Sequence, residues 1–130
     1  MMTWRLARGL EKLRQQVNAK YPNRSRVSDG TIGDRAHSLR VSDHNPVKGV
    51  VHALDLTHNA AKGIDAHALA ERIRQSRDPR ISYIISNRRQ TSARTGWSWV
   101  PYRGKNPHSG HAHFSSVHTS ARDDTRDWKI

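Results

Sequence analysis

The 130-residue sequence contains no cysteine, one phenylalanine and only two glutamates, and hydrophobic residues make up 34% of it. The absence of cysteine excludes disulfides, thiolate nucleophiles and cysteine-bound metal, so histidine and carboxylate side chains must hold any metal ion. No apolar run approaches the ~18 residues that a membrane-spanning helix needs. We expect residues 1–130 to form a single domain with a small core.

Acidic residues as a whole are scarce. The chain has 11 Asp and Glu against 23 Lys and Arg, which gives a formal net charge of +12. Such an excess favours polyanionic partners, namely nucleic acid, anionic lipid surfaces or anionic cell-wall polymers. The basic residues are spread along the chain, which is typical of a diffuse positive field rather than of a helix that reads bases.

The hydrophobic pattern predicts an α+β fold, in which helices flank a small antiparallel sheet. Leu10, Leu13 and Val17 recur at helical spacing behind Thr3, which we expect to cap a first helix that ends near Tyr21. The residues from 25 to 45 are rich in Ser, Asp, Gly and Arg, so they predict a long loop.

The second half of the chain predicts one helix and several short strands. Asp65 has the character of an N-cap for a helix that runs to about Ser76. We expect the charged tail after residue 121 to be irregular, with Trp128 packed back on the body. The predicted strands cover residues 50–56, 81–85, 97–102 and 111–117.

Histidine is enriched, with nine in the chain. His111 and His113 are two residues apart on a predicted strand, so their side chains face the same side. Asp55 lies on a predicted strand whose opposite face is aliphatic, and His44 lies in the loop before it. Zinc is held by imidazole and carboxylate groups, and a catalytic zinc uses three of them and keeps one position open. The sequence therefore predicts one zinc ion bound by residues of this set.

Several of these stretches together resemble a known enzyme family. The motif set of residues 42–46 (SDHNP), 53–55 (ALD) and 111–113 (HAH) resembles that of the M15-type zinc peptidases of peptidoglycan, and most closely the small phage endolysins of that type. Further similar stretches are residues 78–81 (DPRI), 84–89 (IISNRR) and 106–108 (NPH). The resemblance spans nearly the whole chain. It implies a fold of the hedgehog and D-alanyl-D-alanine peptidase group.

The resemblance also implies roles for individual residues. It implies that His44, Asp55 and His113 bind the zinc, and that His111 is a catalytic residue. Many members of the family have an acidic residue where this sequence has Gly110, so the proton-transfer group is His111 or, alternatively, His108 or Asp43. Residues that we expect to contact substrate are Arg40, Ser42, Asn87, Arg89 and His108.

The spacing of the first two ligands departs from the family pattern. Asp55 follows His44 by eleven positions, a longer spacing than is common in the family. The resemblance therefore implies that residues 45–48 form a small insertion that loops out, and Pro46 suits a turn there.

The expected function is hydrolysis of amide bonds in the peptide stems or cross-links of bacterial peptidoglycan, for host lysis. L-alanyl-D-glutamate and D-alanyl-diaminopimelate bonds remain alternatives. We expect a monomer without a separate wall-binding domain, which is attracted to the anionic cell envelope by its positive charge. Because the sequence shows no signal peptide, we expect it to be made in the host cytoplasm and to reach the wall after the membrane is permeabilised.

Two other functions fit part of the sequence. Asp43-His44 is similar to the start of the motif of His-Asn-His endonucleases, which also require a metal, and the positive charge suits DNA. However, Pro46 comes one residue early, and that function leaves the His111 and His113 pair unused, so we regard nucleic acid as an unlikely partner. A non-catalytic basic module that binds nucleic acid or cell wall is the other alternative.

Overall fold

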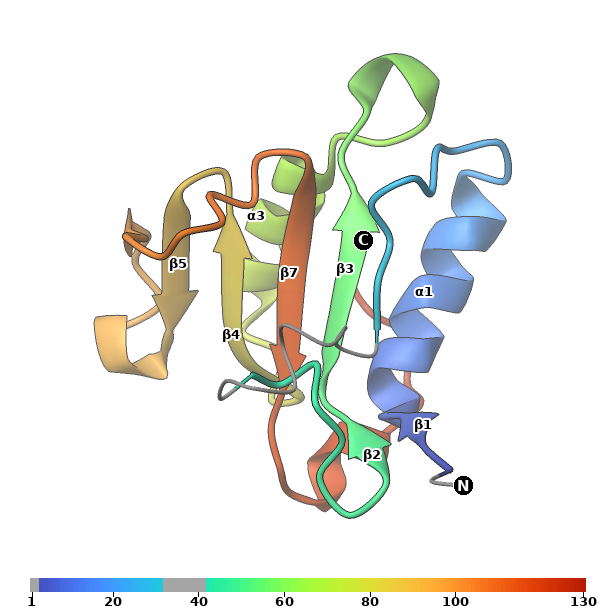
Figure 1. The fold of residues 1–130 in the computed structure, drawn as a ribbon, viewed down its shortest axis with the longest axis vertical. Coiled ribbons are helices and arrows are strands. Elements are labelled where there is room, and N and C mark those ends of the chain that lie inside the picture. Colours follow the sequence, from blue (N-terminus) through green and yellow to red (C-terminus); the bar gives the residue numbers. More distant parts are fainter. Residues whose placement is uncertain (1–2, 32–41) are drawn as a thin grey trace.

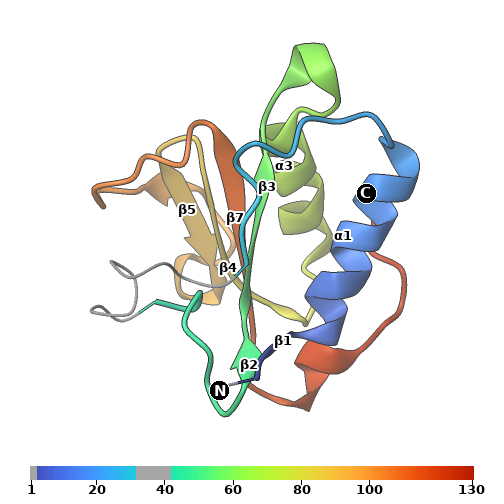
Figure 2. The same ribbon diagram turned by 45° about the vertical axis from the view of Figure 1, so that its right-hand side comes forward.

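The computed structural model describes residues 3–31 and 42–130, in which two α-helices pack on one face of an antiparallel sheet (Figures 1 and 2). This arrangement agrees with the predicted α+β class. The sheet has five strands in the order β3-β7-β4-β5-β6. They are β3 (Ala53–Thr57), β7 (His111–Ser116), β4 (Ile81–Ser86), β5 (Arg89–Ser92) and β6 (Val100–Pro101).

The core lies between the sheet and helices α1 (Arg8–Lys20) and α3 (Ala66–Ser76). Each helix turns one apolar stripe inward, and the strands supply the apolar side chains opposite. A large apolar side chain that is fully buried contributes about 1.5–3 kcal/mol. Fully buried apolar members of this core include Leu10, Leu13, Val17, Leu54, Leu56, Leu69, Ile73, Ile84 and Phe114.

The start of α3 confirms the prediction, whereas the start of α1 does not. Asp65 caps α3, because its side chain accepts a hydrogen bond of 2.9 Å from the backbone N–H of Ala68. Thr3 caps no helix. Helix α1 begins later, after Ala7, because residues 5–6 are extended as β1 (Arg5–Leu6). Asp123 accepts a 3.0 Å hydrogen bond from the backbone N–H of Arg8. A carboxylate distant in sequence thus provides a partner for one of the N–H groups that the first turn of a helix leaves unpaired.

The predicted strand over residues 50–56 is divided in two. β2 (Val50–Val51) pairs in parallel with β1, and β3 joins the main sheet. The break falls at His52, whose N–H donates to the carbonyl of Asp43 and whose carbonyl accepts from the N–H of Ser116.

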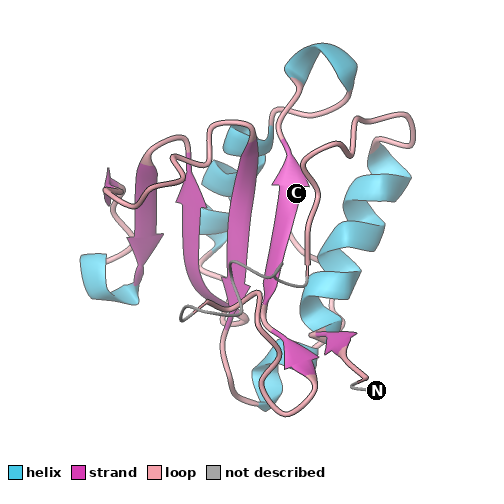
Figure 3. Ribbon diagram, viewed as in Figure 1, coloured by secondary structure: helices cyan, strands magenta, loops and turns pink. Residues whose placement is uncertain are grey.

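The sheet edge beyond β4 also differs from the prediction. β5 was missed because its Arg-Gln-Thr-Ser sequence has no apolar alternation. The turn before it, Asn87 and Arg88, has φ angles of 48° and 68°, as two-residue hairpin turns require. The strand predicted over 97–102 is reduced to β6, because a 3₁₀ turn (Ala93–Thr95) and Trp97 at φ 62° occupy the preceding chain (Figure 3).

The C-terminal tail packs back onto α1, as the sequence predicts for Trp128. This side chain is buried, and its indole N–H donates a 2.8 Å hydrogen bond to the carbonyl of Gly9. The guanidinium of Arg80 lies 3.7 Å from the centre of the Trp128 ring and is itself buried. Arg80 pairs with both carboxylate oxygens of Asp78 and donates to the tail carbonyls of Asp124 and Arg126.

Neither described helix has the length and hydrophobicity that a membrane span requires.

Replacing Arg80 by methionine removes the buried cation while keeping much of the side-chain volume. We expect Arg80→Met to lower the free energy of unfolding by about 3 kcal/mol, because Asp78 and two tail carbonyls lose their partner. Urea denaturation measures this. The matched control is Arg72→Met on the exposed face of α3, which should change stability by less than about 0.5 kcal/mol. Equal effects of the two substitutions would contradict a stabilising role for Arg80.

Candidate metal centre

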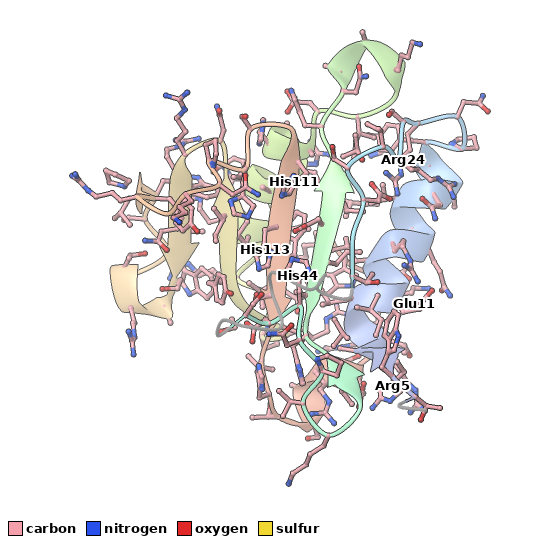
Figure 4. All side chains as sticks on the ribbon, in the orientation of Figure 1. Arg5, Glu11, Arg24, His44, His111 and His113 are labelled. Carbon is pink, nitrogen blue, oxygen red and sulfur yellow. The ribbon has the colours of Figure 1, made fainter. Side chains whose placement is uncertain are left out.

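The sheet carries a group of polar side chains on the face that the helices leave open. Asp55 of β3 and His113 of β7 are direct cross-strand partners. Because side chains alternate along a strand, the neighbours Leu54 and Phe114 face the helices while Asp55, His113 and His111 face the other way. The labelled side chains of His111 and His113 accordingly lie along β7 (Figure 4).

His44 reaches this face from the loop before β2. The loop closes in a tight turn, in which Val47 and Val50 exchange backbone hydrogen bonds of 2.8 and 3.0 Å around Lys48 and Gly49. Both central residues have positive φ angles, 50° and 77°. The tight turn thus lies at Lys48 and Gly49, at the end of the segment 45–48 for which a loop was expected.

The structure brings together the three residues that the resemblance implies as ligands. One ligand atom from each of His44, Asp55 and His113 lies within 4.8 Å of the others. The Nε2 of His44 is 3.2 Å from one Asp55 oxygen, and the Nδ1 of His113 is 3.0 Å from the other. These residues are positioned to bind a metal ion. Three protein ligands would leave a fourth position open, as catalytic metal sites require.

The outer nitrogens of both ligand histidines have partners that fix the rings. The Nδ1 of His44 is 2.6 Å from the carbonyl oxygen of Thr31 and therefore donates to it, while its Nε2 faces Asp55. The Nε2 of His113 is 2.7 Å from the hydroxyl of Ser115. Such partners orient metal-binding histidines. The sequence analysis did not identify Thr31 or Ser115 as such partners. Ser115 lies two residues after His113, so both side chains are on the same face of the strand.

Two more histidines adjoin this group. The Nε2 of His111 is 3.5 Å from an Asp55 oxygen, yet among the described residues it has no hydrogen-bond partner although it is buried. A buried nitrogen without a partner is costly, so it fits a site whose occupant or substrate completes its bonding. The His108 ring is 4.8 Å from the His111 ring, and its Nδ1 donates to the carbonyl of Asn106 at 2.7 Å.

The electrostatics separate the histidines into two kinds. Burial raises the pKa of Asp55, but the hydrogen bonds from His113 and His44 outweigh this and hold it well below its usual range. Burial lowers the pKa of His44, but its contact with Asp55 dominates and leaves it raised. For His111, burial lowers the pKa, and for His108 burial and the nearby His113 and His111 lower it to about 4. His108 and His111 are therefore neutral imidazoles at pH 7.

A cavity of about 630 Å³ opens over the group. Of the residues expected to contact substrate, Ser42 and His108 line this cavity, whereas Asn87 and Arg89 lie outside it. Arg40 lies outside the described residues. Further lining residues are ones to which the sequence analysis assigned no role: Tyr83, Ile85, Tyr102, Lys105 and Asn106.

The other predicted residues have different partners. Asp43, an alternative proton-transfer group, pairs with His118 at 2.9 Å and does not line the cavity. Arg89 stacks over the ring of Trp99, with 4.9 Å between the guanidinium and the ring centre. Gly110, where the resemblance leads one to expect an acid, is exposed and accepts a backbone hydrogen bond from His58.

Comparison of the chain with protein-family models, with curated proteins and with solved structures gives no significant match.

A divalent metal that binds this group should stabilise the folded protein. A free metal concentration one hundred times the Kd adds about 2.7 kcal/mol to the stability. We expect this as a rise in Tm on titration with Zn²⁺, Co²⁺, Ni²⁺ or Mn²⁺. The rise should diminish as the pH falls towards the pKa of His44, because a proton then competes with the metal for this ligand. The pKa of His44 is raised above its ordinary value, so this competition should begin at a higher pH than for an ordinary histidine.

The matched variants change one carboxylate to an amide. Asp55→Asn should abolish most of the rise in Tm, because it removes the charge at the centre of the group. Asp127→Asn, in the exposed tail, should leave it intact. Equal rises in the two variants would show that the metal binds elsewhere.

Proposed function

We propose that this protein is a zinc-dependent peptidase that hydrolyses amide bonds in the peptides of bacterial peptidoglycan. The observation that carries the proposal is the group His44, Asp55 and His113, which lines an open cavity together with His108. His111 does not line this cavity, but its Nε2 lies 3.5 Å from an oxygen of Asp55. The resemblance of the surrounding motifs to M15-type endolysins supports the same conclusion. A hedgehog or D-alanyl-D-alanine peptidase type of fold is part of this proposal.

Zinc is the metal that this ligand set suits best. Two imidazoles and one carboxylate, with the fourth position open, are a common ligand set of catalytic zinc. Sites for Mg²⁺ or Ca²⁺ consist of oxygen ligands instead. Bound zinc would act as a Lewis acid on the scissile carbonyl and lower the pKa of its water towards about 7.

The remaining chemistry belongs to residues of the chain. His111 is neutral at pH 7, so its free nitrogen accepts a proton from the attacking water and then donates it to the leaving amine. His108 is the alternative for this role. Lys105 lines the same cavity and supplies positive charge near the oxyanion that forms in the tetrahedral transition state.

The net charge of +12 supports a substrate held in an anionic polymer. Peptidoglycan and the envelope around it carry many carboxylates and phosphates. In this proposal the domain attaches to the wall through its own surface and acts as a monomer in host lysis. It is made in the cytoplasm and meets the wall after the membrane has been permeabilised.

Purified peptidoglycan and plasmid DNA distinguish the proposed function from its alternatives. Incubation with the zinc-supplemented protein should release soluble muropeptides, and a chelator or Asp55→Asn should prevent the release. Mass spectrometry of the products identifies the bond that is cut. Nicked plasmid without muropeptides would favour the nuclease, and binding of either polymer without cleavage would favour the non-catalytic module.

Replacing His111 separates proton transfer from metal binding. We expect His111→Ala to retain its zinc and lose about 10²–10⁴-fold in kcat, the usual contribution of a general acid or base. Metal analysis and turnover of a soluble muropeptide are measured on the same samples, with Arg72→Gln as the control. Loss of zinc in His111→Ala would make His111 a ligand instead.

A further inference from the structure

A second cavity adjoins the candidate metal centre. Its volume is about 480 Å³, and Tyr83 lines both cavities. Its other lining residues come from β4, β5 and the turn after β5: Ser82, Gln90, Ser92, Ala93 and Arg94. Neither the metal group nor the proposed proton transfer uses this space.

The strand register places the two cavities next to each other on the open face of the sheet. His113 is paired with Ile85, and Ile85 with Gln90, so these three side chains form one row across the open face of the sheet. Tyr83 pairs with Ser92 in the next row along the strands. We refer to the two adjoining cavities together as the groove, whose strand residues come from β3, β7, β4 and β5.

The charge of the groove is positive away from the metal centre. Asp55 is the only carboxylate among the described residues that line either cavity, and the histidines around it already engage both of its oxygens. Arg94 is exposed in the second cavity, and Lys105 is exposed in the first. Neither cation has an acidic partner within the described part of the chain.

We propose that the second cavity is a binding site for a carboxylate of the peptide substrate, with Arg94 as the residue that pairs with it. Serine hydroxyls and the Gln90 amide provide hydrogen bonds for the backbone of the peptide. The inference rests on the proposed function, because it concerns a further part of the peptide that the proposed peptidase would cut.

The sheet geometry sets where that carboxylate lies. From β7 to β5 is two strand spacings, about 10 Å, and Ser92 is about 7 Å further along the strand than Gln90. An extended peptide rises about 3.3 Å per residue. The substrate is therefore an acidic peptide whose free carboxylate lies about three to four residues from the bond that is cut.

The probe is the stem pentapeptide L-Ala-γ-D-Glu-L-Lys-D-Ala-D-Ala, with its two free carboxylates replaced one at a time by carboxamides. The wild-type protein, Arg94→Gln and the control Arg72→Gln, all supplemented with zinc, are titrated with each peptide. Isothermal titration gives the Kd, and mass spectrometry of the same samples detects cleavage. Where cleavage occurs, KM and kcat replace the Kd.

We expect Arg94→Gln to weaken binding of the parent peptide about fivefold, as exposed charge pairs do. One of the two carboxamide peptides should bind equally to the wild-type protein and Arg94→Gln, because it lacks the carboxylate that Arg94 contacts. kcat should change little. Arg72→Gln should behave as the wild-type protein throughout.

An equal effect of Arg94→Gln on all three peptides, no effect at all, or no binding of any peptide would overturn the inference. Cleavage without coupling between Arg94 and a carboxylate would overturn it and leave the peptidase proposal standing. Coupling without cleavage of any peptide would support the groove and contradict the peptidase.

Discussion

The candidate site depends on one carboxylate that is held between two strands. Asp55 is 15% exposed, and a carboxylate withdrawn from water to this extent requires compensating donors or charges. The imidazole nitrogens of His44, His111 and His113 lie 3.2, 3.5 and 3.0 Å, respectively, from its oxygens. A divalent cation at the centre of this group would satisfy the same requirement more fully, since it neutralises the charge and takes the free electron pairs of the rings.

The sheet separates this polar group from the core by alternation alone. Along β7, Ala112 and Phe114 pack against the helices, while His111 and His113 occupy the positions between them. A shift of one residue in register would bury the histidines and expose the apolar residues, so the core itself fixes the register of the site. His44 is the exception, because it lies in a loop and not in a strand. The ion pair of the neighbouring Asp43 with His118 and the tight turn that follows hold this loop in place.

The residues that were predictable from the sequence are those whose position follows from local rules. The two-residue spacing of His111 and His113, the Asp65 cap and the separation of Asp55 from the aliphatic face all depend on neighbours in the chain. The late start of α1 depends on Asp123, and the burial of Arg80 depends on the tail, so no local pattern indicates either. β5 is held by its partners in the sheet rather than by its own sequence, and Tyr83 joins the cleft only because β4 lies beside β7.

The net charge of the whole surface and the individual charges within the groove have different effects in the proposed function. Over the whole surface the net charge of +12 attracts anionic polymers from a distance, and salt screens this field beyond about 8–10 Å. Among the described residues that line the groove, the single acidic group is Asp55, which contacts His44 and His113, whereas Lys105 lines the first cavity and Arg94 the second. In the proposed function, attraction to the polymer needs no particular residue, whereas Arg94 helps to align one peptide along the sheet.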